Sequence, residues 1–418
     1  MAGGATVDRV ANRTCDEASS PLVRLVRTLS AQIFFPVIII AFTEGCTILP
    51  RLPAVPEDCT QLATISSISG ARYWPNIDTA PMERSGNESV HREMLTLKRP
   101  INQLPIAYYL AISGGGDSGA FGAGLLVGWT DSGTRPEFKV VTGISAGALI
   151  APFAFLGPQY DSVLRTVSLS LDSGDLFHRR SWLHALTGDA FADNTPLARV
   201  VARYIDQPLM AAVAKEYAKG RLLLIGTTDL DANQTVVWNM GEIASSNDPR
   251  SLKLFRQVIL ASTSIPGVFP PVMIDVEVSG HRYQEMHVDG GVINQVFLFP
   301  MSLMQDLKLQ RSFDTRERQV FLIRNSRIDA HWQPVARHST EVALRALDAL
   351  IEEQGINDIY RLQVTAQEHG EHLHIAYIEQ SFSYPHAKAF AHDYMSHLFE
   401  YSYKLAMDGY PWHDKLPN

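Results

Sequence analysis

The chain has 418 residues, of which 46% are hydrophobic and 19% charged, as in a soluble globular protein of one large or two smaller domains. Its 36 basic and 44 acidic residues give a formal net charge of −8, without a basic run that could bind a phosphate backbone. This balance argues against a nucleic-acid partner and disfavours electrostatic capture by anionic lipid.

The first 45 residues are typical of a secretory signal. Basic residues precede an apolar stretch, residues 33–42, that is too short for an ordinary transmembrane helix and is interrupted by Pro36. Cys46 follows directly after a small residue, in a pattern that resembles the lipidation box of bacterial lipoproteins. We therefore expect removal of residues 1–45 and acylation of Cys46, which would hold the protein at a membrane of the bacterial cell envelope. An uncleaved signal anchor and a cytosolic tail are the alternatives.

Residues 46–104 are expected to form a proline-rich tether followed by irregular chain. Prolines at positions 50, 53 and 56 favour an extended backbone, and the rest of the stretch is polar with little periodicity. Cys59 has no cysteine left to pair with if the signal is removed and Cys46 is acylated. We therefore expect a loop thiol without a role.

An ordered α/β core is predicted to begin near residue 105. Apolar runs indicate buried strands, and helical stretches follow the first two of them. The predicted strands are residues 106–112, 138–142, 222–228 and 320–323, and the predicted helices are residues 120–129 and 146–155. Because strands alternate with helices, we expect a mostly parallel central sheet with helices on both faces.

Residues 331–418 are predicted to form a mainly helical extension. Apolar residues recur at helical spacing in two stretches, and we expect both stripes to pack against the core. The first stripe is Val342, Leu344, Leu347, Leu350 and Ile351, and the second is Tyr394, Leu398, Tyr401 and Leu405.

Three short glycine motifs follow predicted strands in a fixed order. They are Gly114–Gly119, Gly143–Gly147 and Asp289–Gly291. The second and third are weak signals alone, but all three would occur together by chance in roughly one chain in several thousand. Their combination therefore points to a shared site.

Ser145 lies between an apolar strand and an alanine-rich helix, the context of a nucleophile elbow. Gly143 and Gly147 suit this position because larger side chains would crowd the tight turn and the neighbouring strand. The helix that starts at Ala146 directs its positive end at the serine, so the Ala146 amide joins a candidate oxyanion hole. A serine that only caps the helix is the alternative.

The loop Gly114–Gly119 follows a buried strand and opens a helix. Without side chains, the amides of Gly114, Gly115 and Gly116 can approach an anion closely, and Gly119 completes the motif. A dinucleotide site is the alternative for this pattern. That site requires an acidic residue at the end of the next strand, where this chain has the serine motif.

Asp289 ends a predicted strand that includes residues 281–288, and Gly290 and Gly291 turn the chain away. Its carboxylate is placed to accept a proton from a serine hydroxyl, whereas a turn-forming role is the alternative. His287 would share the same strand face and is the first candidate for the base of a conventional triad. However, no histidine lies in a small-residue loop late in the chain, where a triad histidine is expected.

Two further groups of polar residues have structural explanations. His372 and His374 alternate on a probable edge strand, which explains them better than a metal site. Asp229 and Asp231 flank a turn after a strand and are expected to shape it. No metal site and no cofactor are therefore predicted.

Together these motifs resemble the patatin-like phospholipases, including their bacterial members, over residues 108–299. The resemblance implies a three-layer α/β fold over residues 105–330 and a Ser-Asp dyad without histidine, with Ser145 as nucleophile and Asp289 as general base. It also implies that the first glycine loop helps to form the oxyanion hole. One residue departs from the family pattern, because Ser118 stands where the loop often has a basic residue.

The expected activity is hydrolysis of fatty acyl esters in a lipid or membrane substrate. Asp289 is a weak base, so the site should be partly dry, and Ile265, Val268 and Phe269 could provide this environment and bind an acyl chain. The alternatives are an α/β-hydrolase with a Ser-His-Asp triad, an inactive lipid-anchored binding protein and, less favoured, a nucleotide-binding protein.

Overall fold

The structure, a computed structural model, describes residues 49–417 apart from residues 66–67, 171–173, 175–177, 180–188, 299–315, 331, 333 and 387. The expected signal and the acylation site Cys46 therefore lie outside the described residues. Within the described residues, no helix combines the length and the apolar character needed to span a bilayer.

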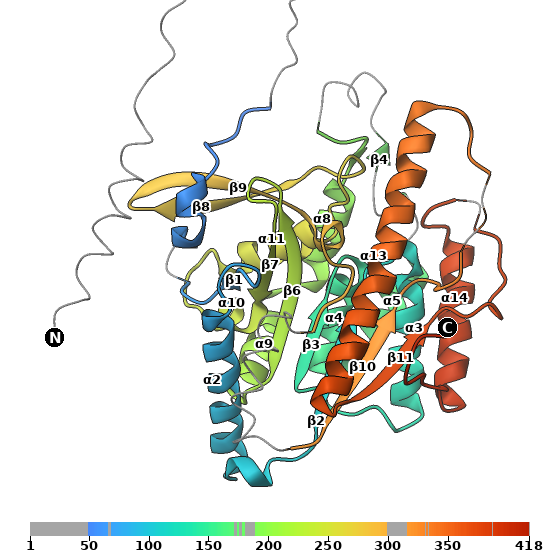
Figure 1. The fold of residues 1–418 in the computed structure, drawn as a ribbon, viewed down its shortest axis with the longest axis horizontal. Coiled ribbons are helices and arrows are strands. Elements are labelled where there is room, and N and C mark those ends of the chain that lie inside the picture. Colours follow the sequence, from blue (N-terminus) through green and yellow to red (C-terminus); the bar gives the residue numbers. More distant parts are fainter. Residues whose placement is uncertain are drawn as a thin grey trace, which may run out of the picture.

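A nine-stranded sheet forms the centre of the described chain (Figure 1). Its main order is β1-β7-β6-β3-β2-β10-β11, and the hairpin of β8 and β9 joins β6 through β9. Strands β6, β3, β2, β10 and β11 run parallel to one another, which confirms the mostly parallel sheet. The strands are β1 Arg72–Tyr73, β2 Ala107–Ile112, β3 Val140–Gly143, β6 Leu222–Asp229, β7 Gln234–Asn239, β8 Val272–Val278, β9 His281–Asp289, β10 Arg318–Arg324 and β11 His372–Tyr377.

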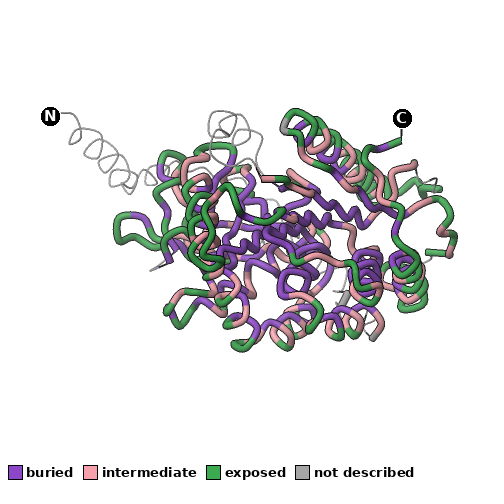
Figure 2. The backbone as a smooth tube through the Cα atoms, turned by 90° about the horizontal axis from the view of Figure 1, so that it is seen from below, coloured by how far each residue is buried: buried purple, intermediate pink, exposed green. Residues whose placement is uncertain are grey.

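Helices cover both faces of this sheet because its central strands are apolar on both sides. In β2, Leu110 and Ile112 belong to one hydrophobic cluster, whereas Tyr109 and Ala111 belong to another on the opposite face. Residues of α3, α4, α11 and α14 fill the first cluster, and residues of α2, α9 and α13 contribute to the second. Figure 2 shows the buried strands enclosed between the helical layers. The three-layer α/β fold is therefore confirmed.

The helices on these faces have the following bounds. They are α2 Ala80–Leu97, α3 Gly119–Asp131, α4 Ala146–Leu156, α5 Asp161–Ser170, α8 Thr195–Tyr204, α9 Gln207–Ala218, α10 Met240–Ser245, α11 Ser251–Ser262, α13 Ser339–His369 and α14 His392–Met407. A separate two-stranded sheet pairs β4 His178–Arg179 with β5 Ala192–Asp193.

The segment expected to be irregular contains regular structure instead. It contributes the 18-residue helix α2, and strand β1 pairs antiparallel with β7 at the sheet edge. Only Met82, Ser85 and Ser89 of α2 are buried, so the helix lacks the apolar stripe that would have revealed it. Cys59 is 1% exposed and disulfide-bonded, so the expectation of an unpaired loop thiol is wrong.

The C-terminal part forms two helices and one further strand of the main sheet. β11 lies at the sheet edge, as expected for His372 and His374, and α14 buries Tyr394 and Leu398 against α3. The first half of α13 differs from the expectation, because Leu350 is 70% exposed and Val342 is 52% exposed. In Figure 1 this orange start of α13 projects beyond the body of the domain. Helical spacing aligns apolar residues on one face but does not determine what covers that face.

Candidate active site

Ser145 occupies a strained turn between β3 and α4. Its backbone has φ +54° and ψ −123°, a conformation that L-residues rarely adopt, and the residue is 7% exposed. A Cβ atom on Gly147 would lie 2.2 Å from the Ile112 carbonyl oxygen, and one on Gly143 would lie 2.4 Å from the Gly147 carbonyl oxygen. The two glycines are therefore required by the close approach of the turn to itself and to β2, as the sequence indicated.

Asp289 is the last residue of β9, and its side chain contacts that of Ser145. β9 pairs antiparallel with β6, and the Asp289 amide donates to the Ser264 carbonyl oxygen at 2.9 Å. The carboxylate accepts hydrogen bonds from the Ser145 side chain and from the Gly291 amide, the latter at 2.8 Å to Oδ1. Burial outweighs both bonds and raises the pKa of Asp289 to about 7. The structure thus brings together a hydroxyl and a carboxylate that are far apart in the sequence.

The glycine loop lies directly beside Ser145. A Cβ atom on Gly114 would be 3.1 Å from the Ser145 Cβ atom, and one on Gly115, which has φ +153°, would be 1.9 Å from the Asn325 carbonyl oxygen. The Gly114 amide donates to the Gln295 carbonyl oxygen at 3.2 Å. It is therefore not available to bind an anion, contrary to the expectation from the sequence. The amides of Gly115, Gly116 and Ala146 are the remaining candidates for an oxyanion hole.

Ser262 supports the nucleophile turn and was not found from the sequence. Its hydroxyl accepts a hydrogen bond from the Ser145 amide at 3.0 Å and donates to the Gly226 carbonyl oxygen at 2.7 Å. Ser262 is fully buried at the end of α11. It therefore ties the turn to strand β6, although nothing in its local sequence distinguishes it from an ordinary helical serine.

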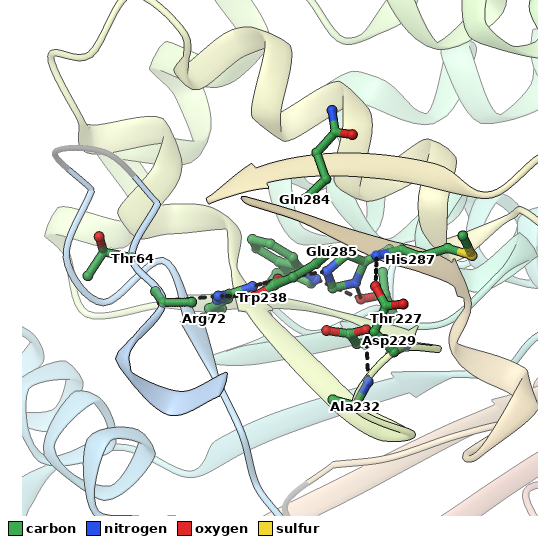
Figure 3. A network of polar contacts seen from close by, with 12 residues as sticks. Thr64, Arg72, Thr227, Asp229, Ala232, Trp238, Gln284, Glu285 and His287 are labelled. Atoms are coloured by element: carbon green, nitrogen blue, oxygen red, sulfur yellow. Dashed lines mark hydrogen bonds and ion pairs between the residues drawn. The ribbon is translucent and has the colours of Figure 1, made fainter. Parts of the chain in front are cut away.

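His287 is held in a buried network of polar side chains (Figure 3). Trp238 donates to the Thr227 hydroxyl at 2.8 Å, and that hydroxyl lies 3.0 Å from His287 Nδ1. His287 Nε2 lies 3.1 Å from the Glu285 carboxylate. Both nitrogens are thus engaged, which argues against His287 as the base of a triad.

The same network contains the grouping that most resembles a metal site within the described residues. Ligand atoms of Asp229, Glu285 and His287 lie within 4.8 Å of one another. However, the Arg72 guanidinium donates two hydrogen bonds to Glu285 and so supplies a cation there (Figure 3). Asp229 accepts the amide of Asp231 at 2.9 Å, which agrees with the turn role expected for both aspartates.

Two cavities meet at Ser145. A small cavity of about 100 Å³ is mainly apolar, and Ile265 and Phe269 line it as expected, whereas Val268 is absent from its lining. Its other apolar side chains include Leu149, Ile150, Val167, Leu197, Phe390 and Met395. The second is an open cleft of about 860 Å³ whose lining is more polar and includes Asp289, Gln295 and Arg327. The serine therefore separates an apolar pocket from a wider polar cleft.

The late histidine His386 also lines the cleft, although sequence reasoning found no such histidine. It bonds Asp117 of the glycine loop rather than Ser145. His374, by contrast, stacks on Phe321 and bonds Gln319 at the sheet edge, in agreement with a structural role. His386 could not be found because no local motif marks it.

Comparison with known proteins identifies the family. Residues 110–302 match the sequence profile of the patatin-like phospholipases, a range that includes both Ser145 and Asp289. The chain therefore contains a patatin-like phospholipase domain over this range. The family supports a lipid acyl hydrolase as the general class of activity. No curated protein sequence matches the chain.

Solved structures of low identity accompany this match. VipD from Legionella pneumophila is 9% identical with a TM-score of 0.34, over 73% of this chain and 67% of that one. Human GIVD cytosolic phospholipase A2 is 12% identical with a TM-score of 0.29, over 66% of this chain and 51% of that one. The family assignment therefore rests on the sequence profile.

Proposed function

We propose that the protein is a serine hydrolase that cleaves fatty acyl esters of lipids with Ser145 as nucleophile and Asp289 as general base. The observation that carries this proposal is the hydrogen bond between the Ser145 side chain and a buried carboxylate whose pKa is raised to about 7. A base with a pKa near neutral pH can take up a proton and return it within one catalytic cycle.

The first half-reaction forms an acyl-enzyme. Asp289 takes the Ser145 proton while Oγ attacks the ester carbonyl carbon, and the carbonyl oxygen becomes an oxyanion. Amides of Gly115, Gly116 and Ala146 stabilise this oxyanion, each donor contributing about 3 kcal/mol. The intermediate then collapses, the bond to the alcohol breaks, and the alcohol leaves with the proton from Asp289.

The second half-reaction releases the fatty acid. Water gives a proton to Asp289 and attacks the acyl carbon, which forms a second tetrahedral intermediate at the same amides. Its collapse breaks the bond to Oγ and returns the proton to Ser145. The chain's own groups therefore supply every proton transfer, with Asp289 as base and acid in turn.

The two cavities suggest how an ester would lie in the site. The part of the acyl chain next to the ester would enter the apolar pocket with Ile265 and Phe269, where burial of each methylene group gains about 0.8 kcal/mol. The alcohol side of the ester then faces the polar cleft, which is open enough for a head group and for the attacking water. This orientation places the scissile bond at Ser145, where the cavities meet.

The test measures hydrolysis of a long-chain p-nitrophenyl ester and labelling by a fluorophosphonate probe. Ser145→Ala should lower kcat at least about 10³-fold and abolish labelling, because the nucleophile is lost. Ser162→Ala, a change at an exposed serine of α5, is the matched control and should behave as wild type. Full activity in Ser145→Ala would refute the proposal, and an unlabelled wild type would favour the inactive binding protein.

We also propose that the mature protein is anchored through an acylated Cys46 in the cell envelope. The support is the sequence pattern around that cysteine. The anchor requires that the mature protein lacks the disulfide bond of Cys59, because neither Cys15 nor Cys46 would remain to pair with it. Mass spectrometry of the mature N-terminal peptide should show a diacylglyceryl group on Cys46. A peptide in which Cys46 is cross-linked to Cys59 would contradict the anchor.

A further inference from the structure

The glycine loop beside Ser145 is bound by residues that follow the family-matched range. Asp117, which is 7% exposed, accepts a hydrogen bond from His386 Nε2 at 2.7 Å and from the Phe390 amide at 2.6 Å. Both donors reach the same oxygen, Oδ2. His386 and Phe390 are thereby fastened to the loop at a single carboxylate oxygen.

A second attachment involves the next residue of the loop. The Ser118 hydroxyl lies 3.2 Å from the Tyr394 hydroxyl, and Tyr394 belongs to α14. The His386 ring stacks on Tyr394, with ring centroids 4.0 Å apart and planes inclined by 19°. Two consecutive loop residues are therefore held by one connected group of C-terminal side chains.

We propose that His386 is a positioning residue for the reaction. Its hydrogen bond to Asp117, which we call the clasp, holds the C-terminal segment against the glycine loop and thereby fixes the amides of Gly115 and Gly116 against Ser145. This inference rests on the proposed function, because the amides matter only if an oxyanion forms there.

The electrostatic setting supports a charged clasp. The hydrogen bond with Asp117 raises the pKa of His386 above its ordinary value and outweighs the opposing effect of burial. His386 is thus stabilised as an imidazolium, which makes its bond to the carboxylate stronger than a neutral one. The other charged or titratable groups that line the cleft are Tyr384, Tyr394, Lys388, Arg324, Arg327, Asp289, Asp329, Asp348 and Glu352.

The clasp predicts a pH dependence with a defined sign. Above the raised pKa the imidazolium loses its proton, so the bond to Asp117 weakens and kcat should fall on the alkaline side. His386→Ala should lower kcat about tenfold with a smaller change in KM, because loose amides stabilise the oxyanion less well. His386→Gln can still donate to Asp117, so its kcat should stay within about threefold of wild type and lose the alkaline decline.

The experiment compares these variants with His397→Ala in hydrolysis of the long-chain ester between pH 5 and 10. His397 also stacks on a tyrosine, Tyr384, but is exposed and absent from the lining of the cleft, so His397→Ala should match wild type. An unchanged kcat and pH profile in His386→Ala would overturn the proposal. Thermal unfolding of each variant identifies a loss that arises from misfolding.

A second measurement tests the clasp without enzymatic activity. The His386 imidazole proton can be assigned by NMR from the spectrum of His386→Gln and titrated in the wild type and in Asp117→Asn. Asp117→Asn should lower the pKa of His386 towards its ordinary value. Equal titration in both proteins would overturn the clasp, whereas an inactive wild type with the expected titration would refute only the proposed function.

Discussion

Two carboxylates on strand β9 lie four positions apart on the same face and have opposite properties. Glu285 is 1% exposed and Asp289 is 5% exposed, so burial alone would raise the pKa of both. Arg72 binds Glu285 and, with His287, lowers its pKa to about 2 against the effect of burial. Asp289 meets a serine hydroxyl and one backbone amide, and its pKa rises to about 7. The partner, rather than the strand or its burial, determines which carboxylate can serve as a base.

The network between the two carboxylates reinforces this difference. His287 lies between them on the strand face and is fixed by Thr227 and Glu285 (Figure 3). Thr227 is also the residue that pairs with Asp289 across β6 and β9. One end of the strand thus forms a fixed ion pair that holds the sheet, and the other end leaves a carboxylate available for proton transfer.

The largest expected effect comes from removing the free carboxylate. Asp289→Asn should lower kcat for the long-chain ester about 10²–10⁴-fold, because an amide can accept the Gly291 bond but cannot take the Ser145 proton. Steady-state kinetics near pH 8 measure the loss. Activity close to wild type would show that another group acts as base. Asp289 would then differ from Glu285 in its pKa but not in its function.

The next effect concerns the ion pair at the other end of β9. Glu285→Gln should lower the free energy of unfolding at pH 7 by about 3–5 kcal/mol, because Arg72 remains buried without its counter-charge. The pKa of Glu285 is depressed, so the stability it contributes is present above its ordinary pKa and is lost as pH falls towards 2. The difference between variant and wild type should therefore shrink in acid.

Urea unfolding measures this difference, and Glu277→Gln at an exposed position of the adjacent strand β8 is the control. The control should change stability by less than about 0.5 kcal/mol. At temperatures where Glu285→Gln is folded, its kcat should remain near that of wild type. A large loss of kcat in folded protein would mean that the two ends of β9 are not separate in function.

A smaller effect with the opposite sign is expected for the stability of Asp289→Asn. The folded-state pKa of Asp289, about 7, is above its ordinary value of 3.8, so the protonated form favours folding and this contribution is lost as pH rises through 7. Above pH 7 the buried charge destabilises the wild type by up to about 4 kcal/mol. The variant should therefore be more stable than wild type at pH 8 and equal to it near pH 4, as measured by urea unfolding. Equal stability at pH 8 would contradict the raised pKa.

The sequence predicts those parts of the site that depend on local spacing. Ser145 and its two glycines form one turn, and Asp289 with Gly290 and Gly291 forms another, so each could be recognised within a few residues. Partners that meet only through the fold could not be recognised. Arg72 lies 213 positions from Glu285, and His386 lies 269 positions from Asp117.

The same reason explains which elements of the fold were predicted. Strands such as β2 and β6 are apolar on both faces, which their own residues reveal, whereas the mainly polar α2 is held by long-range contacts. Its Ser89 hydroxyl donates to the Gly220 carbonyl oxygen across 131 positions. The stripes of α13 and α14 are alike in sequence, and only the fold buries one and exposes the other.

These two helices extend the comparison from charged to apolar side chains and give the smallest expected effect. Leu350 of α13 is 70% exposed, so Leu350→Ala should change the free energy of unfolding by less than about 0.5 kcal/mol. Leu398 of α14 is fully buried, and the matched Leu398→Ala should cost about 2–5 kcal/mol because it leaves a cavity against the core. Urea unfolding of both variants measures the contrast. A loss above about 2 kcal/mol for Leu350→Ala would show that this leucine is covered in solution, and the surroundings of the two stripes would then be the same.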